Sequence, residues 1–106
     1  MRIYTDSSYN WEETDKNGCG TGEICIAQSK TKFTREEITI CVPGLRQLNN
    51  RMEMIAIRLA LKRFGKYKKL EIFSDSRVAV SWTKDPRVKW IPREKNVAGI
   101  ILEENP

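Results

Sequence analysis

Three acidic residues stand among apolar neighbours, and they constrain the fold of this chain more than any other feature. Asp6 ends a strand predicted from Met1, with Ser7 and Ser8 expected in a turn after it, and Asp75 follows a second apolar strand. Glu53 lies inside the apolar arc of a helix predicted over residues 51–64. A single acid at the end of a strand is usually a solvated turn residue. A carboxylate that faces a core is costly, so we expect Glu53 to have a cation partner or a raised pKa.

The order of the predicted elements indicates a mixed sheet. After the first strand and a polar loop over residues 10–22, alternating residues predict strands over residues 23–28 and 33–42. Three successive strands with short connections favour an antiparallel meander. Strand, helix and strand then follow one another, which implies a right-handed crossover back to a parallel strand. The later elements are predicted over residues 70–73 (strand), 76–84 (helix), 87–91 (strand) and 97–104 (helix), the last with Asn96 as its N-cap.

Length and composition predict one globular domain that spans residues 1–106. The chain is 40% apolar and 31% charged, and it has no apolar run of the roughly 20 residues that a membrane span needs. Because the first strand begins at Met1, we expect no signal peptide and a cytoplasmic protein, with neither a membrane nor a small-molecule cofactor as a partner. The net charge of +5 suits a polyanionic partner.

The cysteines and most of the tryptophans are predicted to be structural. Three cysteines without Cys-x-x-Cys spacing predict neither a disulfide nor a zinc site, and Cys25 and Cys41 are expected as small strand residues. Trp82 and Trp90 are expected in the core. Trp11 lies in the polar loop, where it could stack on a nucleotide or cover the loop.

The three acids predict a metal site if the strands that carry two of them are parallel neighbours. Asp6 and Asp75 would then lie at the carboxyl edge of the sheet, and a helix packed on the sheet would bring Glu53 to the same corner. Three convergent carboxylates repel one another unless divalent cations lie between them, and hard oxygen ligands suit Mg²⁺ or Mn²⁺. Two such metals, about 3.5–4 Å apart, are typical of phosphodiester hydrolysis. Because the chain has no histidine, acid–base chemistry must come from carboxylates, lysine or metal-bound water.

Four segments, in the same order along the chain, resemble type 1 ribonuclease H. They are Ile3-Tyr4-Thr5-Asp6-Ser7-Ser8, Asn49-Asn50-Arg51-Met52-Glu53, Phe73-Ser74-Asp75-Ser76 and Trp90-Ile91-Pro92-Arg93-Glu94-Lys95-Asn96. The resemblance implies an α/β fold (α+β mixed), with a five-stranded mixed sheet on which helices pack. It also implies an endonuclease that hydrolyses the RNA strand of RNA–DNA hybrids. Two Mg²⁺ ions, for which Mn²⁺ can substitute, would be held by Asp6, Glu53 and Asp75.

The resemblance extends to contacts with the hybrid. Asn49 and Asn50 match the family's asparagine pair, which contacts the hybrid; otherwise they form an ordinary helix start. Ser7, Ser8 and Ser76, beside the acids, are predicted to bind substrate as well. A basic cluster near the end of the long helix is a candidate for phosphate contacts, although a solvated helix end explains it equally well. The cluster comprises Lys62, Arg63, Lys66, Lys68 and Lys69, of which Lys66, Lys68 and Lys69 are the predicted substrate contacts.

The chain departs from the family in ways that leave two other functions open. Asp6 is followed by Ser7 where the family usually has glycine, and Pro86 runs directly into the last strand, so the family's basic protrusion is absent. The first alternative is a DNA endonuclease of the same superfamily, similar to a resolvase or an integrase core. The second is a nucleic-acid-binding module with weakened catalysis.

The family's fourth acid has no counterpart at the matching position. That position falls on Ile100, or on Gly99 with a shift of one residue, and neither side chain binds a metal. Glu103 and Glu104 lie one turn further along the predicted C-terminal helix. We therefore expect one of them, with Glu103 the stronger candidate, to approach the second metal.

Overall fold

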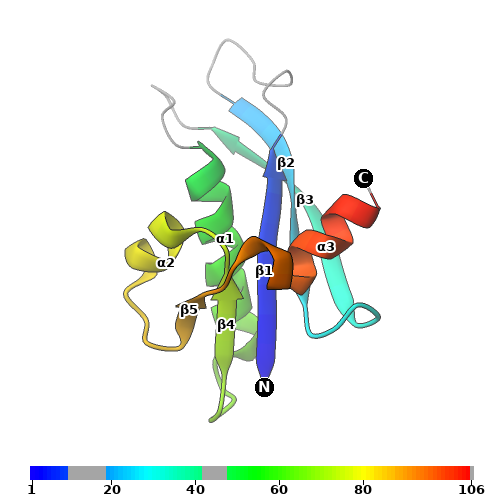
Figure 1. Ribbon diagram of the computed structural model, residues 1–106. Helices are drawn as coiled ribbons and strands as arrows, with labels where there is room; N and C mark the ends of the chain where they lie inside the picture. Colours follow the sequence, from blue (N-terminus) through cyan, green and yellow to red (C-terminus); the bar gives the residue numbers. More distant parts are fainter. Residues whose placement is uncertain (10–18, 42–47, 106) are drawn as a thin grey trace.

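A computed structural model describes residues 1–9, 19–41 and 48–105 and contains a five-stranded mixed sheet with three helices (Figure 1). The strand order across the sheet is β3-β2-β1-β4-β5. The strands are β1 (Arg2–Tyr9), β2 (Cys19–Ala27), β3 (Phe33–Cys41), β4 (Glu71–Ser74) and β5 (Val88–Trp90). The helices are α1 (Leu48–Phe64), α2 (Arg77–Thr83) and α3 (Val97–Glu104), and a 3₁₀ turn covers Arg93–Lys95.

The pairing of the strands confirms the predicted meander and crossover. β1 pairs with β2, and β2 with β3, in antiparallel fashion, whereas β4 is parallel to both β1 and β5. The β1–β4 pairing ends at Tyr4 and Phe73, so Asp6 and Asp75 both lie two residues beyond it on parallel strands. The topology therefore carries both acids to the same edge of the sheet.

Helices α1 and α3 cover opposite faces of the sheet (Figure 1). On one face, Ile3, Ile24 and Ile26 pack against the buried side of α1, which includes Met52 and Ile57. On the other face, the smaller residues Cys25 and Ala27 pack against Ala98 and Ile101 of α3. Each large side chain fully buried in this way stabilises the fold by about 1.5–3 kcal/mol. The alternation of large and small residues along β2 thus determines which helix covers which face.

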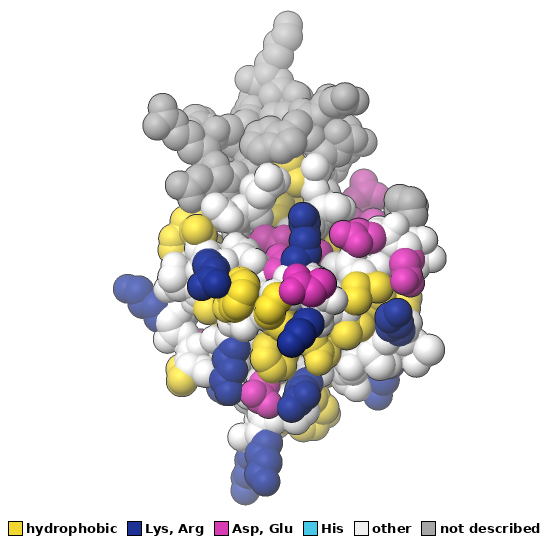
Figure 2. Space-filling view, in the orientation of Figure 1, with side chains coloured by type: hydrophobic (Ala, Val, Ile, Leu, Met, Phe, Trp, Pro, Cys, Tyr) yellow, Lys and Arg dark blue, Asp and Glu magenta, His cyan; other side chains and the backbone are white. Residues whose placement is uncertain are grey.

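Acidic and basic side chains are concentrated in different but overlapping parts of one face. Figure 2 shows most Asp and Glu side chains near its middle and right, with a Lys or Arg side chain among them, and many Lys and Arg side chains over its lower half. The outer side of α1 is exposed at Arg51, Arg58 and Lys62, as its periodicity predicts. No helix among residues 1–9, 19–41 and 48–105 is long and apolar enough to cross a membrane.

Strand β2 begins earlier than predicted, inside a glycine-rich stretch that resembles a loop. A side chain at Gly20 would place its Cβ 1.8 Å from Tyr9 Oη, and one at Gly22 would lie 2.4 Å from Met52 Cε. The two glycines therefore allow β1 and α1 to approach β2 closely. Local composition indicated a loop because it does not reveal such packing. Other boundaries shift by a few residues: α1 begins at Leu48, and β5 covers only Val88–Trp90.

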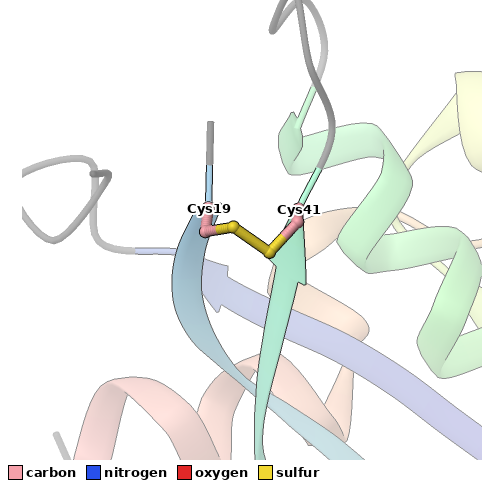
Figure 3. The surroundings of a disulfide bond; sticks show 2 residues. All are labelled: Cys19 and Cys41. Carbon is pink, nitrogen blue, oxygen red and sulfur yellow. A yellow bond between two sulfur atoms is a disulfide. The ribbon is translucent and has the colours of Figure 1, made fainter. Parts of the chain in front are cut away.

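The prediction that the chain forms no disulfide is wrong. Cys19 and Cys41 face each other at the end of the β2–β3 ladder and are joined by a disulfide (Figure 3). The strand register brings them together, and their spacing in the sequence does not reveal it. Cys25 is a free, buried strand residue, as predicted, and burial raises the pKa of its thiol to about 11. The cytoplasmic location stays a prediction, although structural disulfides are more common in oxidising compartments.

Two tryptophans lie on the surface, contrary to the prediction that they belong to the core. Trp82 is 37% exposed and Trp90 is 39% exposed. The core positions of α2 and β5 are instead filled by the smaller residues Ala79 and Val88. Trp90 is the last residue of the edge strand β5, where it pairs with Ser74 of β4. Trp11 lies outside the described residues.

Candidate active site

The three predicted acids meet at the carboxyl ends of the parallel strands. Asp6 projects from β1, Asp75 directly follows β4, and Glu53 lies in the second turn of α1. One carboxylate oxygen from each residue lies within 4.8 Å of the others. This confirms the prediction that strand topology and helix packing bring the acids together.

The site holds negative charge in an environment that disfavours it. Burial, and after it the charge of Asp6, raises the pKa of the Glu53 carboxyl to about 10. Burial also raises the pKa of Asp6, although a hydrogen bond with Glu53 opposes the shift. The backbone N–H of Ser7 donates to Glu53 Oε1 at 3.3 Å. The sequence predicted that Glu53 would have either a cation partner or a raised pKa. Within the described part of the chain it has no cation partner, and its pKa is raised.

One oxygen of Glu53 fits a bound cation. Glu53 is only 9% exposed, and its Oε2 atom has no hydrogen-bond partner among the described residues. A buried carboxylate oxygen without a partner is strongly destabilising, and a divalent cation between the three acids would compensate it. The donors are all carboxylate oxygens, which suit Mg²⁺ or Mn²⁺.

Asn96 holds the two strands and α3 in place around the acids. Its side chain is fully buried, and Nδ2 donates to the carbonyl of Thr5 at 2.9 Å and to Asp75 Oδ2 at 3.2 Å. Its Oδ1 accepts from the N–H of Ala98 at 3.2 Å, which confirms Asn96 as the N-cap of α3. The sequence predicted Asn96 as an N-cap. Its contact with Asp75 could not be predicted in this way, because it depends on how the helix and the strands pack together.

Four of the five predicted small polar contacts surround the acids. Ser7 and Ser8 continue β1 beyond Asp6, so the prediction that they form a turn is wrong; their pairing with β2 extends the strand. Ser76 caps α2 by accepting from the N–H of Ala79 at 3.1 Å, and its hydroxyl lies 3.3 Å from Asn50 Oδ1. The start of α1 is therefore linked to the turn that carries Asp75. The fifth residue, Asn49, is exposed on the first turn of α1.

Comparison with known proteins identifies the family. The model of the RNase H family matches residues 1–101. This chain belongs to the RNase H family. A search of curated proteins finds no match to this RNase H.

Two solved structures are similar to this chain at low sequence identity, and the first of them supports the fold. The structure of LC11-RNase H1 in complex with an RNA/DNA hybrid is 18% identical, with a TM-score of 0.51, over 97% of this chain and 96% of the other. The N-terminal RNase H domain of Rv2228c from Mycobacterium tuberculosis, solved as a fusion with maltose-binding protein, is 17% identical. Its TM-score is 0.49, over 97% of this chain and 93% of the other.

Helix α3 approaches Asp6 so closely at residue 99 that a side chain there would displace the Asp6 carboxylate. A Cβ atom on Gly99 would lie 2.8 Å from Asp6 Oδ2. One turn further, Glu103 lines a hollow of about 170 Å³ together with Asp6, Ser7, Arg93 and Gly99. Glu103 is exposed and shares this hollow with Asp6.

Glu104 lies on a different side of α3. It forms an exposed ion pair with Lys30 at 3.8 Å and does not line the hollow. Of the two candidates, the structure places only Glu103 beside Asp6.

The predicted basic contacts are not brought to the acids. Lys66, Lys68 and Lys69 are exposed at the opposite end of the sheet, where the ammonium group of Met1 donates to the carbonyl of Lys69 at 2.6 Å. Asp6 is five residues along β1 from Met1, which corresponds to about 17 Å. Contact with these lysines would require a substrate that extends across the sheet.

Proposed function

We propose that this RNase H hydrolyses the RNA strand of RNA–DNA hybrids by a two-metal mechanism. The observation that carries the proposal is the buried meeting of Asp6, Glu53 and Asp75, with Glu53 Oε2 left without a partner. These three residues would hold the ions, and Glu103 is the candidate to assist the second ion from the hollow beside Asp6. When bound, the ions would supply an activated water and stabilise the leaving oxygen of the phosphodiester.

The chain's own residues orient the acids. The Ser7 N–H restrains one oxygen of Glu53, and the Asn96 amide restrains one oxygen of Asp75, so each carboxylate keeps a second oxygen for a ligand. Residues held in this way need little reorganisation when the substrate binds. Removal of such a supporting contact around a metal ligand typically lowers metal affinity or activity by roughly 10–100-fold.

The polar rim around the acids supports a hybrid as the substrate. Ser7, Ser8, Asn50 and Ser76 border the site, and Asn49 lies next to them at the start of α1. Hydroxyl and amide groups can bond to sugars and base edges, and contacts to the 2′-hydroxyl distinguish RNA from DNA. The similar structure of LC11-RNase H1 was solved in complex with an RNA/DNA hybrid, which is consistent with this substrate.

The absence of an acid at residues 99 and 100 favours one rival, a nucleic-acid-binding module with weak turnover. Gly99 leaves that position without a metal ligand. The retention of three acids in a costly buried cluster argues against this rival, because binding alone does not require them.

The test is cleavage of a labelled RNA–DNA hybrid, compared with a DNA duplex of the same sequence, in Mg²⁺, in Mn²⁺ and in a chelator. We expect metal-dependent cleavage of the RNA strand that leaves a 5′-phosphate and a 3′-hydroxyl. Equal cleavage of the DNA duplex would favour a DNA endonuclease. Binding of the hybrid without cleavage in either metal would favour the binding module.

A further inference from the structure

Trp90 and Arg77 form a stacked pair on the surface beside the acids. The guanidinium carbon of Arg77 lies 3.9 Å from the centre of a Trp90 ring. The indole Nε1 of Trp90 donates to the backbone carbonyl of Asp75 at 3.2 Å. Arg77 is the first residue of α2 and follows directly on the N-cap Ser76. The pair is therefore attached to the turn that carries Asp75 at two points.

Arg77 differs from several other arginines because its charge is not paired with an acid. Arg35, Arg63 and Arg87 form ion pairs with Glu23, Glu36 and Asp85. Arg77 forms none with any acid in residues 1–9, 19–41 and 48–105, and it is exposed. Stacking on an indole fixes the plane of a guanidinium but leaves its N–H groups free to donate.

A free guanidinium at this place compensates for an electrostatic problem of the site. The cluster of three acids repels the phosphates of a nucleic acid. Arg93 lines the hollow on the Asp6 side of the site, and the lysines at the far end of the sheet are too distant to offset this repulsion near Asp75. Arginine is suited to phosphate because its planar fork of donors matches the phosphate oxygens, and a pre-ordered side chain loses little entropy on binding.

We propose that Arg77, held by Trp90, binds a backbone phosphate of the hybrid next to the phosphate that is cleaved. Trp90 is also a positioning residue, because its indole N–H fixes the backbone of Asp75. The proposal rests on the proposed function and adds a substrate-binding residue outside the predicted set. The rival explanation is that the stacked pair only covers the Asp75 turn.

The test compares four variants in steady-state cleavage of the hybrid at several salt concentrations. Arg77→Ala removes the charge, Arg77→Lys keeps the charge without the planar fork, and Trp90→Phe keeps a ring without the N–H donor. The matched control is Arg58→Ala, which removes the same charge from the exposed outer side of α1. Thermal unfolding of each variant checks that it is folded.

We expect Arg77→Ala to raise KM about tenfold and to reduce the salt dependence of hybrid binding by about one unit of slope. Arg77→Lys should restore the slope and only part of the affinity. Trp90→Phe should lower kcat with little change in KM, because the ring remains but Asp75 loses a restraint. Arg58→Ala should match the unchanged protein.

Two results would overturn the proposal, and they are distinguishable. If the unchanged protein cleaves the hybrid and Arg77→Ala matches Arg58→Ala in KM and salt slope, the pair is only structural, and the proposed function stands. If the unchanged protein neither binds nor cleaves the hybrid, both the proposed function and this role of Arg77 are wrong. If Trp90→Phe leaves kcat unaltered, Trp90 has no positioning role.

Discussion

The two ends of β1 carry charge in opposite ways. At the amino end, Arg2 and Lys89 both pair with Glu71, and these pairs are largely exposed. At the carboxyl end, Asp6 and Glu53 are largely buried beside each other, and burial raises the pKa of both carboxyls. The strand between these ends is only about 17 Å long from Met1 to Asp6.

The difference shows where this fold uses charge for stability and where it uses charge for function. Exposed ion pairs contribute about 0–1 kcal/mol each, so the amino end gains and loses little from its charges. Buried like charges destabilise the fold unless a cation or a proton compensates them. The acids at the carboxyl end of β1 therefore lower the stability of the metal-free protein, at a place where cations can bind.

Replacement of one acid should separate activity from stability. We expect Asp75→Asn to lower cleavage of the hybrid by roughly 100-fold or more, because it removes a metal ligand. The variant should be as stable as the unchanged protein or more stable, because one like charge is gone. The measurements are steady-state cleavage and thermal unfolding, with the exposed acid Glu37 changed to Gln as the control. Full activity in Asp75→Asn would disprove the assignment of the site.

The stability of the metal-free protein should fall as the pH rises. The pKa of Glu53 is raised to about 10 in the folded protein from an ordinary value of 4.5. The folded state thus keeps a proton that the unfolded chain releases. This contribution is complete below the ordinary pKa and is lost as the pH rises through the folded pKa. The slope for one group is at most about 1.4 kcal/mol per pH unit.

Urea unfolding in a chelator, at several values between about pH 5 and pH 9, measures this slope. Glu53→Gln should flatten the dependence, because the amide does not titrate. Added Mg²⁺ should restore stability most at high pH, where the carboxylate binds the ion without releasing a proton. The same pH slope in the unchanged protein and in Glu53→Gln would show that Glu53 is not the source.

The two glutamates of α3 allow a test of which residue assists the second metal ion, because one serves as the control for the other. We expect Glu103→Gln to raise the Mg²⁺ concentration needed for half-maximal cleavage by roughly tenfold, because Glu103 lines the hollow beside Asp6. Glu104→Gln should leave the titration unaltered, because Glu104 pairs with Lys30 instead. Identical Mg²⁺ titrations for both variants and the unchanged protein would remove Glu103 from the site.

The smallest effect is expected at the amino end of the sheet. Neutralisation of Lys66, Lys68 and Lys69 together should reduce the salt dependence of binding only for hybrids long enough to reach them. Short hybrids that cover the acids alone should bind the triple variant and the unchanged protein alike. Binding measured against salt for a long and a short hybrid makes this comparison. If the long hybrid shows no change, the lysines form only a solvated helix end.

Much of the fold and the acid cluster could be predicted because short-range patterns determine them. Strand and helix periodicity defined the order of the elements, and parallel strands necessarily carry Asp6 and Asp75 to one edge. The apolar arc around Glu53 predicted a buried acid, and the structure confirms it. Asn96 was predicted as a helix cap from its position before α3.

The remaining features depend on distances that local patterns do not contain. Cys19 and Cys41 meet only because of the strand register. Lys66 follows α1 closely in the sequence, but a helix of 17 residues is about 26 Å long and carries its end away from Glu53. The exposure of Trp90 follows from the short length of β5, which the alternation of its residues did not show.

The close approach of Gly99 to Asp6 also limits how this site could change. Any substitution that adds a side chain at residue 99 pushes against the carboxylate of Asp6 before it can add a metal ligand of its own. A fourth acid at this position therefore requires either a shift of the Asp6 carboxylate or an outward movement of α3, which Ala98 and Ile101 anchor in the core. An additional metal ligand is therefore easier to introduce in the next turn of α3 or in β1 than at residue 99.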